Sequence, residues 1–101
     1  MRNHGPVAVL EVCTFSAQGD DGALRAADAR MQTDFAYQQP GLRRRTTARG
    51  DGDRWCVVTL WDSAERAEQA AQAAEHDEVA TAFWALVDRD SVRVERYTLL
   101  E

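Results

Sequence analysis

The feature that most constrains the fold is the run Trp55–Trp61, in which every residue is apolar or β-branched. Such an uninterrupted run is typical of a β-strand whose two faces are both buried. It ends at Asp62 and Ser63, which favour the start of a helix, and Glu65 follows Asp62 at the spacing of a capping box. A chain of 101 residues is too short to place a helical layer on each face of a sheet. We therefore expect a second copy of the chain to cover one face.

Length and composition are those of an ordinary single domain. The chain is 45% hydrophobic and 29% charged, and a domain of this size buries about two-thirds of its unfolded surface. We expect one domain over residues 1–101, with residues 1–6 as a flexible lead-in. No apolar stretch approaches the roughly 18 residues that span a bilayer, and the N-terminus lacks the pattern of a secretory signal. These features predict a cytoplasmic protein with no membrane partner.

The charge balance argues against nucleic acid as a partner. Seventeen acidic residues outnumber twelve arginines, so the net charge is −5. The one basic cluster, Arg43–Arg45, lies in an expected strand, where successive side chains point to opposite faces and form no continuous basic surface. We expect these arginines to be solvent-exposed charges on an edge strand, where they oppose strand-on-strand aggregation.

The cysteines and histidines do not form a metal-binding pattern. Cys13 and Cys56 both lie inside apolar strand-like runs and form no C-x-x-C pair. His4 and His76 share no ligand spacing with them. We expect two free, buried thiols, with a disulfide between them as the less favoured alternative. The sequence thus predicts no metal site and no bound cofactor.

Strand-like and helix-like patterns alternate along the chain. The apolar residues from Leu24 to Phe35 recur at helical spacing, and Gly50–Asp53 is typical of a hairpin turn. We expect strands at Val7–Phe15, Leu42–Arg49, Trp55–Trp61 and Ser91–Leu100, and helices at Ala23–Gln38 and Ala64–Asp88, the second broken near His76.

This β-α-β-β-α-β order predicts an α+β, ferredoxin-like fold with a four-stranded antiparallel sheet. In that arrangement the first and third strands are central, and both are apolar on their two faces. The second and fourth strands carry most of the charges, as edge strands do. Both helices cover one face of the sheet, so the opposite face is free to pack against its copy in a homodimer.

Three segments resemble the antibiotic biosynthesis monooxygenase family of the dimeric α+β barrel superfamily. They are Phe35–Leu42, with its Pro-Gly before the second strand, Trp55–Ser63 with the alanine-rich helix that follows, and the downstream helix around Val79–Phe83. The resemblance extends over nearly the whole chain, from about Val7 to Leu100. It implies a dimeric α+β barrel more firmly than it implies any one reaction.

The resemblance also implies a function and a site. The family's quinone-forming oxygenases use neither metal nor flavin, since the deprotonated substrate itself reduces oxygen inside an apolar cavity. Trp61 matches the tryptophan that ends the third strand, where it would donate its indole N–H to a small aromatic substrate. Tyr37, Phe83 and Trp84 would line the same cavity, and His76 would be the catalytic base. The alternatives are structural: core packing for the aromatic residues and an exposed helix cap for His76.

The chain departs from the better-defined branches of the family. The haem-degrading members pair the tryptophan with an asparagine and a histidine, and those positions hold Val12 and either Phe83 or Trp84 here. The asparagine of the anthrone oxidisers falls on Val57. Haem breakdown by that route is therefore not expected, and the anthrone chemistry would lack one of its polar groups.

Two classes of function remain open from the sequence. One is a cofactor-independent monooxygenase that oxidises an aromatic polyketide, an anthrone or a quinol. The other is a non-catalytic dimeric protein that binds ligands or assists another enzyme, and a polyketide cyclase-like role in the same cavity is a related enzymatic alternative. A cavity between helices and sheet is required by each of them.

Overall fold

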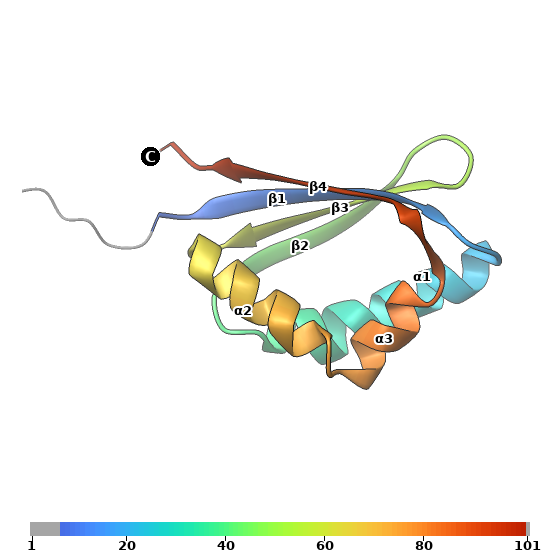
Figure 1. Ribbon diagram of the computed structural model, residues 1–101, viewed down its shortest axis with the longest axis horizontal. Coiled ribbons are helices and arrows are strands. Elements are labelled where there is room, and N and C mark those ends of the chain that lie inside the picture. The colour runs from blue at the N-terminus through green and yellow to red at the C-terminus, as the bar shows by residue number, and fades with distance from the viewer. Residues whose placement is uncertain (1–6, 101) are drawn as a thin grey trace, which may run out of the picture.

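In the computed structural model, residues 7–100 are described, and they form a four-stranded antiparallel sheet with helices on one face (Figure 1). The expected lead-in, residues 1–6, lies outside the described residues. The elements in chain order are β1 (Val9–Ala17), α1 (Asp21–Arg30), β2 (Leu42–Arg49), β3 (Arg54–Trp61), α2 (Ala64–Ala74), α3 (Glu78–Trp84) and β4 (Val87–Thr98). A π-helical turn, Met31–Phe35, and a 3-10 turn, Ala36–Gln38, continue α1. The strand order β2-β3-β1-β4 confirms the ferredoxin-like α+β fold, with β1 and β3 in the centre.

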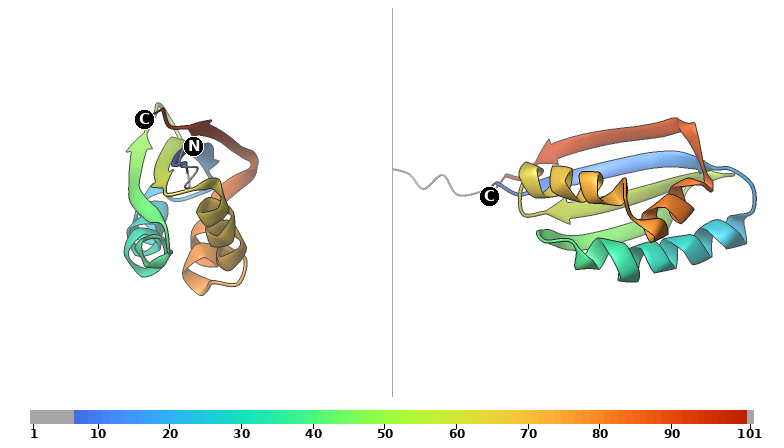
Figure 2. Two further views of the ribbon diagram at one scale, coloured as in Figure 1. Left: turned by 90° about the vertical axis from the view of Figure 1, so that its left-hand side faces the viewer. Right: turned by 60° about the horizontal axis from the view of Figure 1, so that its bottom comes forward.

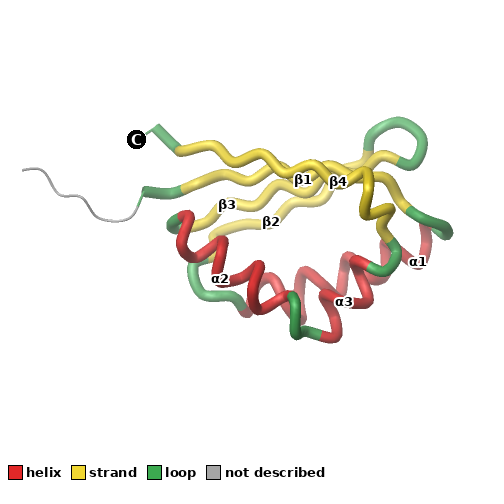
Figure 3. The backbone as a smooth tube through the Cα atoms, in the orientation of Figure 1, coloured by secondary structure: helices red, strands yellow, loops and turns green. Residues whose placement is uncertain are grey.

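The sheet and the helices form two layers. In the end-on view of Figure 2, α1 lies beside α2 and α3, and all three face the same side of the sheet. The hydrophobic core between the layers contains the fully buried side chains of Phe15, Leu24, Phe83 and Val87. No element of residues 7–100 covers the other face of the sheet, as the tube in Figure 3 also shows.

Side-chain caps determine where the helices begin. A carboxylate oxygen of Asp20 accepts the backbone N–H of Ala23 at 2.8 Å, so α1 begins two residues before the predicted Ala23. At the start of α2 the cap is Ser63, whose hydroxyl accepts the N–H of Arg66 at 3.2 Å. The prediction of a capping box at Asp62 was wrong, because its carboxylate forms an ion pair with Arg43.

The second helical region is broken where the sequence predicted, but it ends earlier. Asp77 caps α3 by accepting the N–H of Ala80 at 2.9 Å, which confirms a break beside His76. The predicted end at Asp88 was wrong, since α3 stops at Trp84 and β4 starts at Val87 rather than Ser91. Val87 pairs with the last residue of β1 and is only 1% exposed. Burial of this valine against the sheet outweighs continuation of the helix.

Two irregularities in the edge strands direct side chains toward the helices. In β2 an extra residue at Arg43 shifts the register, so that Leu42 and Arg45 both lie on the helix-facing side although they are three residues apart. In β4 the register shifts between Asp88 and Arg93, and the sharp bend is visible beside α3 in Figure 1. The Ser91 hydroxyl fills the gap by accepting the Ser16 backbone N–H at 2.8 Å.

The outer strand ends differ from their predicted positions by two residues. β1 begins at Val9 rather than Val7, and it continues beyond the predicted Phe15 to Ala17. β4 ends at Thr98, two residues before the predicted Leu100. Between the 3-10 turn and β2, Gly41 has φ +88, and a Cβ there would lie 2.5 Å from Cγ of Arg66. Only glycine suits this approach of the β2 entry to α2.

Candidate active site

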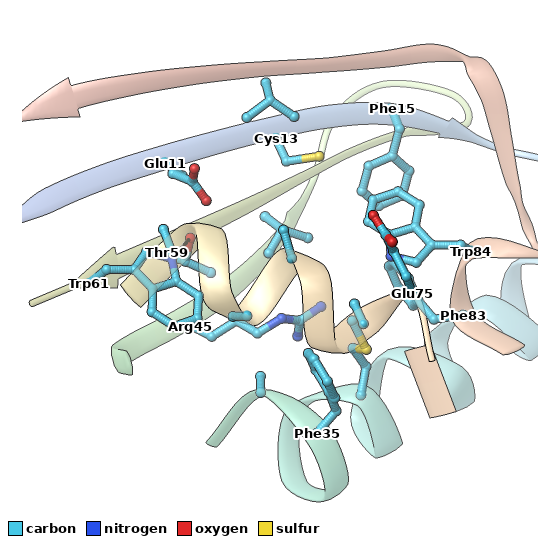
Figure 4. Close-up of a pocket in the computed structure, with 18 of the residues that line it drawn as sticks. Glu11, Cys13, Phe15, Phe35, Arg45, Thr59, Trp61, Glu75, Phe83 and Trp84 are labelled. Carbon is cyan, nitrogen blue, oxygen red and sulfur yellow. Dashed lines mark hydrogen bonds between the residues drawn. The ribbon is translucent and has the colours of Figure 1, made fainter. Parts of the chain in front are cut away.

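A cavity of about 820 Å³ lies between the sheet and the helices (Figure 4). Its floor is the helix-facing side of β1 and β3, and its walls come from α2, α3 and the π-helical turn after α1. The volume falls within the range of pockets that hold small-molecule ligands, roughly 300–1,000 Å³. Most of the lining is apolar, and the polar side chains named below are few and spaced apart.

The space exists because α2 presents small side chains to the sheet. Ala67, Ala70, Ala71 and Ala74 all line the cavity, and the first two are buried. At these positions a helix that fills its core carries larger residues such as leucine. The alanine-rich composition of α2 therefore leaves room for a ligand instead of completing the core.

An aromatic cluster forms one end of the cavity. Phe15 meets Phe83 and Trp84 edge-to-face, with ring centroids 5.8 and 5.9 Å apart, and the latter two rings lie 5.1 Å from each other. Edge-to-face packing holds the three rings in fixed orientations. Phe83 and Trp84 thus lie in the wall of a cavity, as predicted from the sequence. Phe83 is also almost fully buried and belongs to the hydrophobic core.

Trp61 lies at the opposite end of the cavity and does not present a free indole donor. Its side chain is buried, and Nε1 donates a hydrogen bond of 2.9 Å to the hydroxyl of Thr59. Thr59 also lines the cavity, and its own hydroxyl proton has no acceptor among residues 7–100. The indole therefore polarises Thr59, and the threonine hydroxyl is the donor available to a ligand. Sequence analysis missed Thr59 because a threonine in a strand is most simply explained by β-propensity.

Arg45 lies inside the cavity wall, and its predicted role as a solvent-exposed charge was wrong. Its side chain is 4% exposed and forms an ion pair with Asp28 of α1 at 2.7 Å. The other terminal nitrogen donates to Gln32 and Thr47, at 3.1 and 3.3 Å. The guanidinium also lies 5.8 Å from the ring centre of Phe83. The register shift in β2 turns the Arg45 side chain toward the helices, and no pattern in the sequence predicted this shift.

An ion network borders the cavity between β1, β4 and α2. Arg96 donates two hydrogen bonds to one carboxylate oxygen of Glu11, at 2.7 and 2.9 Å, and a third to Glu68 at 3.2 Å. The hydrogen bonds to Glu11 raise the pKa of Arg96 above its ordinary value. Glu11 and Arg96 both line the cavity, so this side carries a carboxylate that already has a cationic partner.

The two cysteines lie on opposite faces of the sheet and are free, as predicted. Cys13 lines the cavity, and Cys56 belongs to the helix-free face. Burial raises the pKa of the Cys13 thiol from 9.0 to about 11, and the charge of Glu11 adds to the effect. Cys13 is therefore protonated at neutral pH and acts as part of an apolar wall rather than as a nucleophile.

Two residues predicted from the sequence do not line this cavity. His76 is exposed in the turn between α2 and α3. Tyr37 is 45% exposed, and its hydroxyl accepts the backbone N–H of Arg45 at 2.8 Å from the outer side of β2. The structure thus brings Trp61, Phe83 and Trp84 to one cavity and leaves His76 and Tyr37 outside it.

Within residues 7–100, no group of three or more histidine, cysteine, aspartate or glutamate side chains is arranged to hold a metal ion. Over the same residues, no helix is both long and apolar enough to cross a membrane.

Comparison with solved structures finds the same fold in proteins of different descriptions. SnoaB from Streptomyces nogalater, described as a cofactor-independent oxygenase, is 24% identical, with a TM-score of 0.79 over 94% of this chain and 95% of its own. A Caulobacter crescentus protein, provisionally described as an antibiotic biosynthesis monooxygenase, is 12% identical, with a TM-score of 0.80 over 95% and 92% of the two chains. A dimeric ferredoxin-like protein from an uncultured marine organism is 13% identical, with a TM-score of 0.66 over 94% and 90%.

Comparisons of sequence alone give no such match. No protein-family model matches the chain, and no curated protein sequence matches it significantly. At these identities, structural similarity establishes the fold and not the reaction. The chain has the ferredoxin-like fold of structures provisionally described as antibiotic biosynthesis monooxygenases, which confirms at the level of the fold the resemblance predicted from its sequence.

Proposed function

We propose that the protein is a cofactor-independent monooxygenase that oxidises an aromatic substrate, such as an aromatic polyketide, an anthrone or a quinol. The observation that carries the proposal is the 820 Å³ apolar cavity, which has an aromatic cluster at one end and the Thr59–Trp61 pair at the other. Its size suits a molecule of two or three fused rings. The similarity in fold to SnoaB, which is described as a cofactor-independent oxygenase, supports the same reaction class.

The chemistry requires little from the protein beyond binding, orientation and proton transfer. A deprotonated anthrone or quinol is electron-rich and can reduce O₂ directly. For an anthrone, the methylene carbon becomes a carbonyl: one oxygen atom enters the product, and the other leaves as water with the two methylene hydrogens. The apolar walls cover part of the substrate surface, and the Thr59 hydroxyl donates to the substrate oxygen on which negative charge develops.

Glu11 is the residue that we propose as acceptor of the first substrate proton. It lines the cavity on the β4 side, and only one of its two carboxylate oxygens binds Arg96. His76, the base predicted from the sequence, is exposed outside the cavity. Comparing Glu11→Gln with His76→Ala distinguishes the two, because loss of a general base typically lowers the rate by roughly 10²–10⁴. We expect the larger loss in Glu11→Gln, and a large loss in His76→Ala alone would overturn the assignment.

The working form that we propose is a homodimer in the cytoplasm. On the helix-free face, Leu10 pairs with Leu60 and Val12 with Val58, and all four side chains are only half-buried. Packing this face against its copy would remove the apolar surface from water. The structural relative described as a dimeric ferredoxin-like protein supports this arrangement. The two free cysteines suit a reducing compartment.

Oxygen consumption tests the proposed reaction. The purified protein is mixed with an anthrone in the presence of a metal chelator, and oxygen uptake is compared with spontaneous oxidation of the same substrate. We expect protein-dependent uptake with one O₂ consumed per substrate and no hydrogen peroxide released. If aromatic compounds bind and raise the melting temperature but no phenol or anthrone is oxidised, the protein is a ligand-binding protein and the proposal is wrong.

A further inference from the structure

We propose that Arg45 makes this cavity selective for aromatic molecules that carry an anionic oxygen, either a carboxylate or a phenolate. The inference rests on the proposed function only in that both assign the ligand to the same cavity. It adds a property that neither the fold nor the aromatic lining requires, namely recognition of charge.

The position of Arg45 suits this role. Figure 4 shows its side chain extending from β2 into the space above Phe35, toward the middle of the cavity. The residue is 5% exposed, so its charge is held away from bulk water. A guanidinium carries five N–H donors, and the interactions with Asp28, Gln32 and Thr47 use three of them. The Nε–H has no acceptor among residues 7–100 and is available to a ligand.

The hydrogen-bond partners of Arg45 lie on the side of its guanidinium that faces away from the cavity. Asp28, Gln32 and Thr47 line a separate groove between α1 and β2, and none of them lines the cavity. The cation therefore contributes to the cavity wall while its counter-ion lies on the other side of that wall. Thr47 also donates to the Asp28 carboxylate at 3.1 Å, which fixes the counter-ion in place. This arrangement orients the guanidinium before any ligand enters.

The other two arginines that line the cavity, Arg89 and Arg96, are less suited to binding an anionic ligand. Arg96 already holds two carboxylates, and its side chain is 36% exposed. Arg89 is exposed and lies 5.8 Å from the ring centre of Trp84, at the edge of the aromatic cluster. A charge-assisted hydrogen bond from buried Arg45 is stronger than one at either exposed site, because water competes less there. The Asp28 carboxylate neutralises most of the charge of Arg45. The gain in affinity for an anionic ligand therefore depends on the N–H groups of Arg45 that have no partner.

The first test compares a charged probe with its neutral isostere. We would measure the affinity of the intact protein for 2-naphthoate and for 2-naphthamide by calorimetry. We expect naphthoate to bind at least about tenfold more tightly, the effect of one charge-assisted hydrogen bond. A phenol gives a second readout, since nitrophenol and its phenolate absorb at different wavelengths. Binding should lower the pKa of nitrophenol. Equal affinities, tighter binding of the amide, or no binding of either probe would overturn the proposal.

Variants assign the effect to Arg45. Removing the arginine alone leaves the partly buried Asp28 carboxylate without its cationic partner and risks unfolding, whereas replacing both partners of a buried pair by apolar residues is often tolerated. The double variant Arg45→Met with Asp28→Leu should fold, bind naphthamide normally and lose the preference for naphthoate. Arg43→Gln, two residues away on the protein surface, is the matched control and should keep it. Retained preference in the folded double variant would assign the charge recognition elsewhere.

These outcomes are independent of catalysis. The binding experiments need no oxygen and no turnover, so the anion preference can hold even if the protein oxidises nothing. Conversely, oxygenase activity on a neutral anthrone with no preference for naphthoate would leave the proposed function intact and contradict the role of Arg45.

Discussion

At the scale of single residues, the proposed function depends on a few polar groups in an apolar cavity. Thr59 and Trp61 form a donor pair on β3, Arg45 supplies a buried cation, and Glu11 supplies a carboxylate. Val57 lies on the same floor, where it offers no hydrogen bond. The anthrone oxidisers that the sequence resembles have an asparagine at this position. The Thr59 hydroxyl lies two residues along the same strand face, and in the proposed reaction it supplies the polar group instead.

The Thr59–Trp61 pair leads to a prediction about rate. Trp61→Phe removes the indole N–H that polarises Thr59, and Thr59→Val removes the hydroxyl while keeping the shape of the side chain. We expect each change to lower kcat, with a loss on the order of 10²–10³ for Thr59→Val, as for other donors to a developing oxyanion. Steady-state kinetics with an anthrone measures both.

A matched substitution separates chemistry from packing. Trp55→Phe makes the same change as Trp61→Phe in the same strand, but Trp55 does not line the cavity, and its buried Nε1 has no hydrogen-bond partner among the described residues. We expect Trp55→Phe to leave kcat unchanged. If Trp61→Phe lowers the melting temperature without changing turnover, Trp61 is a core residue and its proposed role is wrong.

Cys13 allows a test based on its perturbed ionisation. Because burial raises the pKa of its thiol from 9.0 to about 11, the thiolate fraction at pH 8 is roughly hundredfold below that of an ordinary cysteine. In a Cys56→Ser background, alkylation of Cys13 by iodoacetamide should be slow and should accelerate as the pH rises toward 11. Mass spectrometry gives the rate, and the urea-unfolded protein is the control. A rate that levels off near pH 9 would contradict the buried position.

Three of the four aromatic residues predicted for the cavity line it, and Tyr37 does not. Trp61, Phe83 and Trp84 line the cavity because large apolar residues on helix-facing positions must lie near the core. Arg45 and Thr59 gave no such signal. Whether an arginine in an edge strand faces solvent or the interior depended on a one-residue register shift in β2, and only tertiary pairing determines that shift.

At the scale of elements, boundaries were the least predictable feature. The β2 strand was predicted with the observed ends, since Gly41 and the turn Gly50–Asp53 mark both of them. The start of β4 was missed because no glycine or proline separates α3 from it, and Ala85 and Leu86 suit a helix as well. The pairing of Val87 with the end of β1 determines where β4 starts, and the two residues are far apart in the sequence.

The alanines of α2 lead to a prediction about size selectivity. Ala70 is buried and lines the cavity, so Ala70→Leu should project three further carbons into the ligand space. We expect KM for a three-ring anthrone to rise roughly tenfold or more, with a much smaller effect for a single-ring quinol. Ala73→Leu, on the exposed side of the same helix, is the matched control. Equal effects on large and small substrates would show that Ala70 does not bound the ligand space.

At the scale of the whole molecule, the helix-free face of the sheet is the main unexplained surface. Because β3 is apolar on both of its faces, the sequence predicted that one face of the sheet would lack helices. The helices do lie on one face only. What the sequence could not predict is the size of the cavity on the helix side, because that depends on how closely α2 approaches the sheet.

Dimer formation can be tested on the helix-free face. Val58 is half-buried opposite Val12 in the centre of that face. Val58→Asp would place a charge in the proposed interface, where burial without a partner is strongly unfavourable. Sedimentation velocity should show a dimer for the unaltered protein at micromolar concentration and a folded monomer for the variant. Ala82→Asp, on the exposed side of α3, should remain dimeric. A well-folded, monomeric unaltered protein would contradict the proposal.

The most direct measurement of the proposed activity is isotope incorporation from ¹⁸O₂. An anthrone is oxidised by the protein under labelled oxygen in ordinary water with a chelator present, and the quinone is examined by mass spectrometry at early times, before carbonyl exchange with water. The proposed reaction predicts one ¹⁸O atom in each product molecule, with the second recovered as labelled water. A quinone without label, or one formed with release of hydrogen peroxide, would contradict the assignment of this protein as a monooxygenase.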